Sequence, residues 1–421
     1  MSADLRLAGK ELGAVCDAVR PGEAADAIGG QVPAFVAAPS STAQASALMR
    51  VAAEHDLAVL PRGSGSRLHW GTPAQCDVVL ETLQMDRVIE HAAGDLVARV
   101  QAGARIGEVA AVLAAAGQEI ALDVPPSATI GGVVADALAG PRRLRYGSPR
   151  DLLIGITVVR ADGVVARSGG KVVKNVAGYD LGKLFAGSAG TLGLITEVTF
   201  RLHPLPAARA WVTTEIAGAD DVAAAVATAA NSPLVASAVE LSRSQPGGPA
   251  GVSVLLEGSA DGVAARAETM AGLLSAATVS TAAPAWWRGV PDPGPGPDGA
   301  AGTLLRATFW VSALGRVLEA IDGAARTSGT HPQVHGPAGA GMLYITLDAD
   351  APPAGVARLA AAIREAIPAG RGGVMVVAAP GQVRSVMGSE VVPGAMLMRA
   401  VKDQFDPGGR MAPGRSPGEL S

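Results

Sequence analysis

Two glycine-rich stretches that lie far apart in the sequence carry residue types suited to holding an anionic ligand. The first is PRGSGSRLHWG at 61–71, and the second is AGSAGTLG at 186–193. Glycines open the backbone N–H groups to close approach, and small hydroxyls add donors, which phosphate oxygens require. A further pair, Gly131-Gly132, stands where a helix is expected to begin, and helix N-termini also attract anions. A single loop of this kind would suggest only a tight turn, but three favour a large phosphate-bearing cofactor.

Other chemistries find little support in the residue pattern. The six histidines form no HExxH motif and no His/Cys group, so no metal site is expected. There is no P-loop motif, and Gly63-Ser64-Gly65 lacks the third glycine of a nicotinamide Rossmann site. The run Ala186–Gly190 nearly matches the GxSxG elbow of serine hydrolases, but its first residue is alanine and a strand is expected after it. We therefore do not expect Ser188 to act as a nucleophile.

The charge and the cysteine content exclude further classes of protein. The formal net charge of −4 argues against a nucleic-acid or anionic-membrane surface. Two cysteines cannot form a disulfide scaffold or the ligand set of an iron–sulfur cluster, and they favour a reduced, cytoplasmic setting. The densest basic cluster, Arg142-Arg143-Leu144-Arg145, is expected to pair with carboxylates. The sequence has neither a secretion signal nor an apolar run of the roughly 18 residues that span a membrane.

The first glycine loop is expected to follow a strand of an α/β region in the first half of the chain. Two β-rich runs flank a helix that Ser41 or Thr42 would cap, and the second run leads directly into the loop at 61–71. A hairpin is indicated where Ala161-Asp162-Gly163 joins two further β-rich runs. In this region we expect strands at 34–38, 57–60, 77–81, 87–91, 96–101, 154–160 and 164–167, and helices at 42–55 and 105–116.

A second alternation of strands and helices begins at residue 210. Its two halves of similar length predict an antiparallel sheet backed by helices. The expected strands are 210–216, 235–241, 251–257, 303–309, 342–348 and 373–378, and the expected helices are 220–231, 260–276, 312–327 and 354–367. The predicted fold class is α+β. The predicted domains are an N-terminal helical segment at 1–30, a cofactor domain at 31–206, a second α+β domain at 207–393 and a C-terminal return at 394–421.

Five motifs, in the same order, resemble those of the vanillyl-alcohol-oxidase (PCMH-type) FAD-binding family. The run PRGSGSRLHWG is similar to its pyrophosphate loop, DVPPSATIGGVVA to the loop along the flavin, and 178–206 to its adenosine side. Residues 100–117 and 405–415 are similar to its strand–helix unit and its C-terminal return. The likeness is strongest to the small FAD-binding component of bacterial glycolate oxidases. It implies a two-subdomain PCMH-type FAD-binding domain followed by an α+β cap domain with an antiparallel sheet.

The resemblance assigns cofactor contacts to particular residues of this chain. It implies that backbone from Arg62 to Ser66 holds the pyrophosphate of FAD. The expected cofactor-binding residues are Pro61, Arg62, Gly63, Ser64, Gly65, Ser66, Gly71, Pro126, Ser127, Thr129, Ile130, Gly131, Gly132, Gly190, Thr191, Gly193 and Ile195. The FAD is expected to be non-covalent, because Ser66 stands where covalently flavinylated relatives have histidine and His69 comes three residues late.

One departure from the family's pattern concerns the chemistry at the substrate. Relatives that oxidise 2-hydroxyacids have a GHxGDGNxH-like segment, whose place is taken here by 338–344. Ala340, Met342 and Tyr344 replace its Asp, Asn and His. The base that would take the substrate proton is therefore not identified, and the catalytic residues stay unknown. His335 lies nearby, but a lone histidine is more often a structural residue.

The resemblance implies an FAD-dependent oxidoreductase that acts on CH–OH groups. The favoured function is the FAD-binding subunit of a glycolate oxidase-like complex that oxidises glycolate, a small 2-hydroxyacid, to glyoxylate. The implied partners are a catalytic flavoprotein subunit and an iron–sulfur subunit, and the implied location is the cytoplasm, with peripheral attachment to the inner membrane through these partners. The alternatives are a self-sufficient FAD-dependent D-2-hydroxyacid dehydrogenase, a non-catalytic assembly module, and a cytokinin- or sugar-type oxidase, which Ser66 disfavours.

Overall fold

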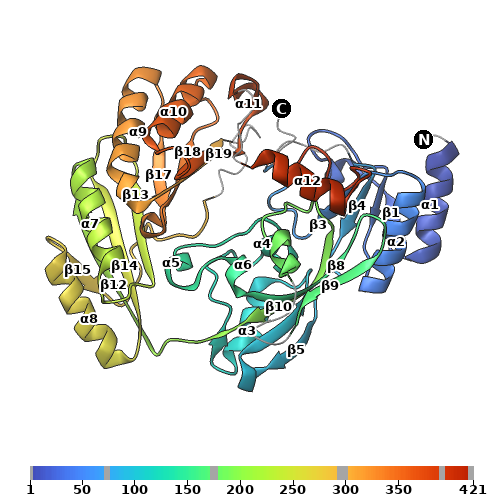
Figure 1. Ribbon diagram of the computed structural model, residues 1–421, viewed down its shortest axis with the longest axis horizontal. Coiled ribbons are helices and arrows are strands. Elements are labelled where there is room, and N and C mark those ends of the chain that lie inside the picture. Colours follow the sequence, from blue (N-terminus) through green and yellow to red (C-terminus); the bar gives the residue numbers. More distant parts are fainter. Residues whose placement is uncertain (1–2, 71–75, 171–178, 292–301, 388–393, 416–421) are drawn as a thin grey trace. The chain divides into compact units, whose positions relative to one another are not determined.

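The computed structural model describes residues 3–70, 76–170, 179–291, 302–387 and 394–415. The chain divides into two compact units, whose elements are labelled in Figure 1. Unit 1 comprises Met1–Leu138, Ser148–Leu205 and Val391–Ser421, and unit 2 comprises Ala139–Gly147 and Pro206–Glu390. Both units combine helices with sheets, and the predicted α+β class is confirmed. Among the described residues, no helix is both long enough and apolar enough to cross a membrane.

A four-stranded sheet in unit 1 leads into the first glycine loop. Its strands, in spatial order, are β1 (Val19–Pro21), β2 (Phe35–Ala37), β4 (Val78–Glu81) and β3 (Val59–Arg62). The last three run parallel, and the crossover from β2 to β3 is the helix α2 (Thr42–Glu54). Ser41 caps this helix by accepting a hydrogen bond from Gln44 N (3.2 Å). The first helix, α1 (Ala3–Val15), packs beside α2, and Leu12, Leu48 and Val59 share their core.

A five-stranded antiparallel sheet forms the other half of unit 1. Its strands, in order, are β5 (Val88–Ala92), β6 (Val97–Gln101), β10 (Leu194–Arg201), β8 (Leu153–Val159) and β9 (Val165–Gly169). The predicted hairpin between β8 and β9 is confirmed, and its turn is held by Val164 N, which donates to Asp162 Oδ1 (3.1 Å). Gly163 adopts a left-handed φ of +79°, as this turn requires.

The remaining elements of unit 1 are short. They are η1 (Ala24–Asp26), η2 (Ala93–Asp95), α3 (Ile106–Ala114), β7 (Gln118–Glu119), α4 (Ile130–Ala135), α6 (Pro149–Leu152), η3 (Leu181–Phe185), β11 (His203–Pro204) and α12 (Ala395–Phe405). After α12 the chain returns to β3. Val59 N donates to Arg410 O (2.8 Å) and Ala412 N donates to Val59 O (2.8 Å), so that Arg410–Ala412 runs parallel to β3 along its outer edge.

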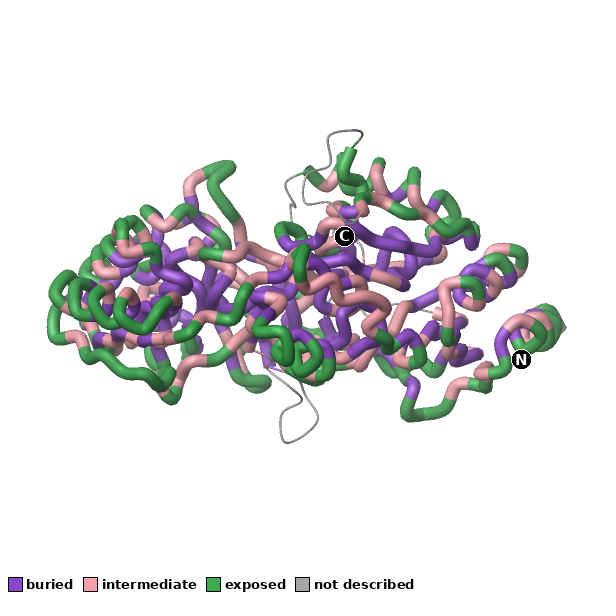
Figure 2. Tube along the Cα trace, turned by 90° about the horizontal axis from the view of Figure 1, so that it is seen from below, coloured by how far each residue is buried: buried purple, intermediate pink, exposed green. Residues whose placement is uncertain are grey.

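Unit 2 is built on one eight-stranded antiparallel sheet. Its strands, in order, are β15 (Thr278–Ser280), β12 (Ala208–Ile216), β14 (Ala250–Gly258), β13 (Ala238–Arg243), β17 (Gln333–Gly336), β18 (Met342–Leu347), β16 (Thr303–Phe309) and β19 (Gly372–Ala378). One face is covered by α7 (Ala219–Asn231), α8 (Ala260–Leu273), α9 (Leu314–Ser328) and α10 (Pro353–Ala366). Their apolar stripes bury alternate strand residues such as Val212 and Leu343. Figure 2 shows the buried strands beneath helices with exposed outer sides.

Short elements complete unit 2. They are α5 (Arg143–Tyr146), η4 (Val311–Ala313), η5 (Ala338–Ala340) and α11 (Gly381–Met387). Of these, α5 lies in Ala139–Gly147, which belongs to unit 2 although unit 1 precedes and follows it in the sequence.

A buried carboxylate, Glu257 of β14, anchors this segment. Its Oε1 accepts hydrogen bonds from Arg142 Nη1 (3.3 Å) and Arg209 Nε (2.9 Å), and its Oε2 accepts one from the Tyr146 hydroxyl (3.2 Å). The side chain of Glu257 is 1% exposed and that of Arg142 is 8% exposed. The prediction that the basic cluster pairs with carboxylates is thus confirmed for Arg142.

The anchor makes the stability of unit 2 depend on pH. Burial by itself raises the pKa of Glu257, but the charges and hydrogen bonds of Arg142 and Arg209 outweigh it and lower the pKa below its ordinary value of 4.5. A carboxylate with a lowered pKa stabilises the folded state above its unfolded pKa. This stabilisation is lost as the pH falls through the folded-state pKa.

We expect Glu257→Gln to lower the free energy of unfolding at pH 7 by about 3 kcal/mol, because it leaves the buried Arg142 without its counter-charge. The difference from the wild type should narrow as the pH falls below about 4. Urea unfolding across this pH range measures both effects. The control is Glu268→Gln on the exposed side of α8, which should change stability by less than about 0.5 kcal/mol. Equal stability of Glu257→Gln and the wild type at pH 7 would contradict the anchor.

Candidate functional site

A pocket in unit 1 brings the glycine loops together. It is lined by the loop that follows β3, by the start of α4 and by the segment that leads into β10. The space between the lining atoms is about 750 Å³ when open solvent at the mouth is included. The two loops lie far apart in the sequence, yet they form one concave surface.

Most of the residues predicted to bind the cofactor line this pocket. They are Pro61, Arg62, Gly63, Ser64, Gly65, Ser66, Thr129, Gly131, Gly132, Gly190, Gly193 and Ile195. The contacts of each with FAD stay predictions, but their convergence gives a large ligand a single place to bind.

The other predicted residues lie elsewhere. Ile130 and Thr191 are buried beneath the lining, with 0% and 3% exposure. Pro126 and Ser127 are exposed and are not part of the lining. Gly71 lies outside the described residues. Ile130 and Thr191 therefore support the lining from behind and are not presented to the pocket.

The closest approach in the pocket wall is between Gly63 and Thr129. A β-carbon at position 63 would lie 2.1 Å from Thr129 Oγ1, a distance that no side chain tolerates. The Thr129 hydroxyl cannot easily move away, because it caps α4 by accepting a hydrogen bond from Gly132 N (3.3 Å). Glycine at position 63 is therefore required by packing, independently of any ligand.

The second glycine loop is shaped by left-handed backbone and by its own hydroxyls. Gly187 and Gly190 have φ of +87° and +77°. The Ser188 hydroxyl donates to Phe185 O (2.9 Å), and the Thr191 hydroxyl donates to Ser188 O (2.6 Å). Ser188 is 7% exposed, so that its side chain holds the turn and is not presented to a substrate.

Lys402 of α12 ties this loop to the C-terminal return. Its buried Nζ donates to Thr191 O (2.8 Å), to Met411 O (2.8 Å) and to Asp406 Oδ2. An ammonium group has three donors, and all three are used here. No sequence motif indicated this residue, because its link to the loop depends on Thr191, which lies 211 residues away in the sequence.

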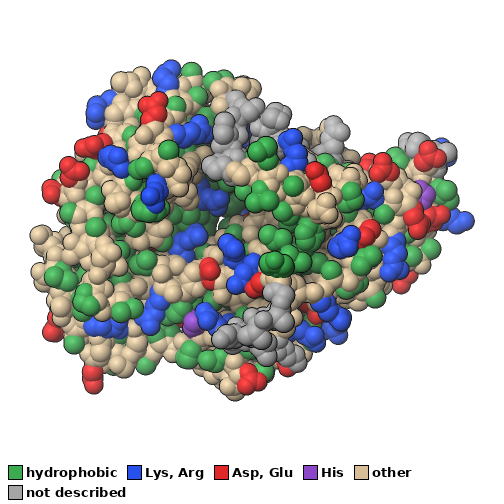
Figure 3. All heavy atoms as spheres, viewed as in Figure 1, with side chains coloured by type: hydrophobic (Ala, Val, Ile, Leu, Met, Phe, Trp, Pro, Cys, Tyr) green, Lys and Arg blue, Asp and Glu red, His purple; other side chains and the backbone are tan. Residues whose placement is uncertain are grey.

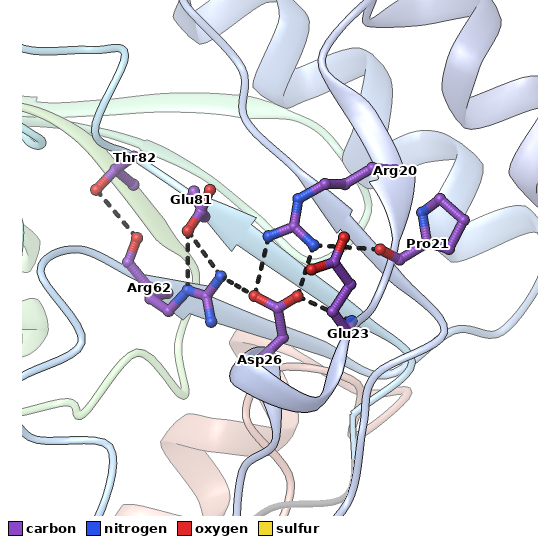
Figure 4. A network of polar contacts seen from close by, with 7 residues as sticks. All are labelled: Arg20, Pro21, Glu23, Asp26, Arg62, Glu81 and Thr82. Carbon is purple, nitrogen blue, oxygen red and sulfur yellow. Dashed lines mark hydrogen bonds and ion pairs between the residues drawn. The ribbon is translucent and has the colours of Figure 1, made fainter.

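Arg62, at the start of the first loop, is held by an acidic network (Figure 4). Its Nη2 lies 2.7 Å from Asp26 Oδ1 and 2.7 Å from Glu81 Oε1. Arg20 Nη1 binds the other oxygen of Asp26 at 2.6 Å. Hydrogen bonds from Arg20 and then Arg62 hold the pKa of Asp26 well below its usual range, although burial opposes this. The charge of Arg62 is therefore compensated within the protein, and its side chain fixes the start of the loop.

Three further charged residues line the pocket, and sequence reasoning did not assign them to it. They are Arg67, Asp136 and Arg415. The Arg67 guanidinium lies over the Trp70 ring, 4.9 Å from its centroid, and Nη1 donates to Ser66 Oγ (3.3 Å). Backbone amides, small hydroxyls and guanidiniums thus surround a glycine-lined hollow. This donor set fits a phosphate-bearing dinucleotide such as FAD.

In unit 2, the segment 338–344 does not present acid–base groups. Ala338–Ala340 forms the short helix η5, and Met342 and Tyr344 are 3% and 5% exposed on β18. His335 on β17 is also buried, and its Nε2 lies 3.0 Å from Arg288 O. Burial lowers the pKa of His335 to about 4, so that its imidazole is neutral at pH 7. Among the described residues, no group of three or more His, Cys, Asp or Glu side chains is arranged to hold a metal ion.

The sheet of unit 2 also carries a guanidinium with a weak acceptor. Arg306 on β16 is half-buried, and its Nη2 donates to Met375 Sδ (3.3 Å). In the sheet register Arg306 pairs with Tyr344 on one side and Met375 on the other. A thioether sulfur is a poor acceptor, so this guanidinium retains donors for an anionic group.

Comparison with known proteins relates the region with the first glycine loop and the start of α4 to FAD binding domains. Residues 33–169 match the family of FAD binding domains (FAD_binding_4). Glycolate oxidase subunit GlcD of Bacillus subtilis (strain 168) is 39% identical over 182 residues, which are 42% of this chain and 38% of that protein. Glycolate oxidase subunit GlcE of Escherichia coli (strain K12) is 38% identical over 153 residues, 35% of this chain and 43% of that protein.

A third relative, D-lactate dehydrogenase of Archaeoglobus fulgidus, is 37% identical over 175 residues, 40% of this chain and 38% of that protein. The chain therefore matches only about two fifths of the length of these curated relatives. Solved structures share the fold over much more of the chain. p-Cresol methylhydroxylase with substrate bound has a TM-score of 0.73 at 18% identity, covering 100% of this chain and 98% of that one. Alkyldihydroxyacetonephosphate synthase has a TM-score of 0.71 at 15% identity, covering 97% and 84%.

We expect Gly63→Ala to displace the first loop and to weaken flavin binding, at a cost of about 1–3 kcal/mol from overpacking against Thr129. The measurement is the ratio of flavin to protein after purification, with titration of the stripped protein. Gly13→Ala on α1 is the matched control, because a β-carbon there meets no atom within 4 Å. It should leave flavin binding unchanged. Undiminished flavin content in Gly63→Ala would contradict the required close approach.

A second expectation concerns Lys402. Lys402→Met leaves the buried carboxylate of Asp406 without its counter-charge and should lower the free energy of unfolding of unit 1 by about 3–5 kcal/mol. Lys183→Met provides the comparison, since the pair of Lys183 with Asp180 (3.4 Å) is solvent-exposed and contributes at most about 1 kcal/mol. Urea denaturation, monitored by circular dichroism, measures the free energy of unfolding of both variants. Similar losses for both variants would mean that Lys402 is not a tether.

Proposed function

We propose that the chain is the FAD-binding subunit of a complex that oxidises a 2-hydroxyacid, since residues 33–169 match the family of FAD binding domains. The proposed substrate is glycolate and the proposed product is glyoxylate. The observation that carries the proposal is the likeness to two proteins named as glycolate oxidase subunits, GlcD and GlcE. The glycine-lined pocket of unit 1, with its phosphate-type donors, supports it.

The composition of unit 2 favours a subunit over a complete enzyme. Relatives that oxidise 2-hydroxyacids are expected to have Asp, Asn and His at three positions of the segment 338–344. This chain has Ala340, Met342 and Tyr344 at those positions. A thioether and a phenol do not replace the imidazole that takes a proton near neutral pH. In this proposal, a catalytic flavoprotein subunit supplies the base, and an iron–sulfur subunit receives the electrons.

FAD, when bound non-covalently, supplies the acceptor for the hydride on the α-carbon of a 2-hydroxyacid. The chain's own residues bind and orient. Backbone from Gly63 to Ser66 and from Gly190 to Ile195 would hold the cofactor.

An exposed apolar surface on α12 supports association with a partner. Met396, Leu397 and Met398 are 89%, 70% and 41% exposed. In Figure 3 hydrophobic side chains gather at the surface over this helix. Large apolar side chains grouped on a surface are typical of protein–protein contacts.

The second candidate function is a self-sufficient FAD-dependent D-2-hydroxyacid dehydrogenase. The similarity to a D-lactate dehydrogenase favours it. The two candidates differ in whether the isolated chain turns over substrate.

Purification from the native host tests the proposal. We expect the chain to co-purify with partner proteins, to show a flavin absorbance spectrum and to release the flavin on acid denaturation. Glycolate should reduce the flavin of the complex but not that of the isolated chain. A chain that purifies alone and oxidises glycolate or D-lactate would replace the proposal with the second candidate. A colourless chain that releases no flavin would refute both.

A further inference from the structure

The C-terminal return brings one arginine to the pocket of unit 1. Met411 is bridged to Val59 of β3, on the strand that runs into the first glycine loop. Four residues later, Arg415 lines the same pocket as Gly63 and Ser66. The hydrogen bonds on either side of Met411 fix the position from which Arg415 extends.

Arg415 is attached to the far end of the first loop. Its Nη1 donates to Leu68 O (3.1 Å), and its Nη2 donates to Arg67 O (3.3 Å). Both acceptors are backbone carbonyl oxygens, which carry no net charge. A guanidinium has five N–H donors, so that donors of Arg415 are left for another acceptor in the pocket.

The positive charge of Arg415 is compensated less than that of Arg62. Arg62 is paired with two carboxylates, Asp26 and Glu81. Burial lowers the pKa of Arg415, and the charge of one carboxylate, Asp136, counteracts this. A guanidinium that is removed from water and bonded to neutral carbonyls gains most from an anionic ligand.

We propose that Arg415 is a phosphate-binding residue of the cofactor site, which contacts the pyrophosphate of FAD and at the same time fixes the loop 63–68 that surrounds it. This inference rests on the FAD binding of the proposed function and extends it to a residue of the C-terminal return. Backbone amides of the loop offer only partial positive charges to the pyrophosphate. Arg415 adds a full positive charge beside them.

A purely structural role makes a different prediction. If Arg415 only tethered Arg67 and Leu68, its replacement would weaken all ligands of the pocket alike. If Arg415 also contacts phosphate, its replacement would weaken ligands that carry phosphate more than ligands without it. Riboflavin, which has no phosphate, therefore separates the two roles.

The experiment uses the full chain stripped of flavin and titrated with FAD, ADP and riboflavin. We expect Arg415→Gln to weaken FAD and ADP by roughly 10- to 100-fold and riboflavin by much less. Arg415→Lys, which keeps the charge, should show a smaller loss. The matched control is Arg410→Gln, which removes an arginine of the same segment that pairs with Asp56 and does not line the pocket. Its affinities should equal those of the wild type.

Three outcomes would overturn the inference. Wild-type affinity for FAD in Arg415→Gln would exclude the contact, and an equal loss of FAD and riboflavin would assign Arg415 a structural role only. A wild-type chain that binds no FAD would refute the proposed function and this inference with it. If Arg415→Gln does not fold, the test uses Arg415→Lys. An Arg415→Lys variant that binds FAD and ADP as tightly as the wild type would then overturn the inference, since a lysine cannot reproduce the two-nitrogen contact.

Discussion

The pocket of unit 1 depends on how closely two loops can approach each other. Gly63 packs so near Thr129 that a β-carbon would lie 2.1 Å from the threonine hydroxyl. This contact joins the loop after β3 to the start of α4, so that glycine backbone forms part of the inner surface of the pocket. The rest of unit 1 keeps these loops in place. Lys402 ties the loop before β10, and the Asp26 and Glu81 carboxylates hold Arg62.

The charges of the pocket follow a division of roles. Arginines that fix backbone, such as Arg62, are neutralised by carboxylates of the protein, so that they are satisfied before any ligand arrives. Unit 2 uses the same device, with Glu257 neutralising Arg142. Guanidiniums that donate to carbonyls or a thioether, such as Arg415 and Arg306, retain capacity for anions.

Local patterns were sufficient to predict much of the fold. The helices α2, α7, α9 and α10 and the β8–β9 hairpin were predicted because periodicity, caps and a turn signal lie within the segments themselves. The strand β17 was missed because Gln333–Gly336 is short and has one β-branched residue. The glycine loops were predicted from their composition. Lys402 and the partners of Arg62 were not, because a buried charge is recognised by neighbours that are distant in sequence.

The path of the chain sets an order on when unit 1 can be finished. Unit 2 is inserted between Leu205 and Val391, and the hydrogen bond of Arg415 to Leu68 spans 347 residues. A ribosome therefore releases both glycine loops long before it releases the residues that brace them. During synthesis the whole of unit 2 is translated before Lys402 and Arg415 can complete the pocket of unit 1. With Arg415 in the contact proposed above, stable binding of the flavin follows translation of the C-terminal return.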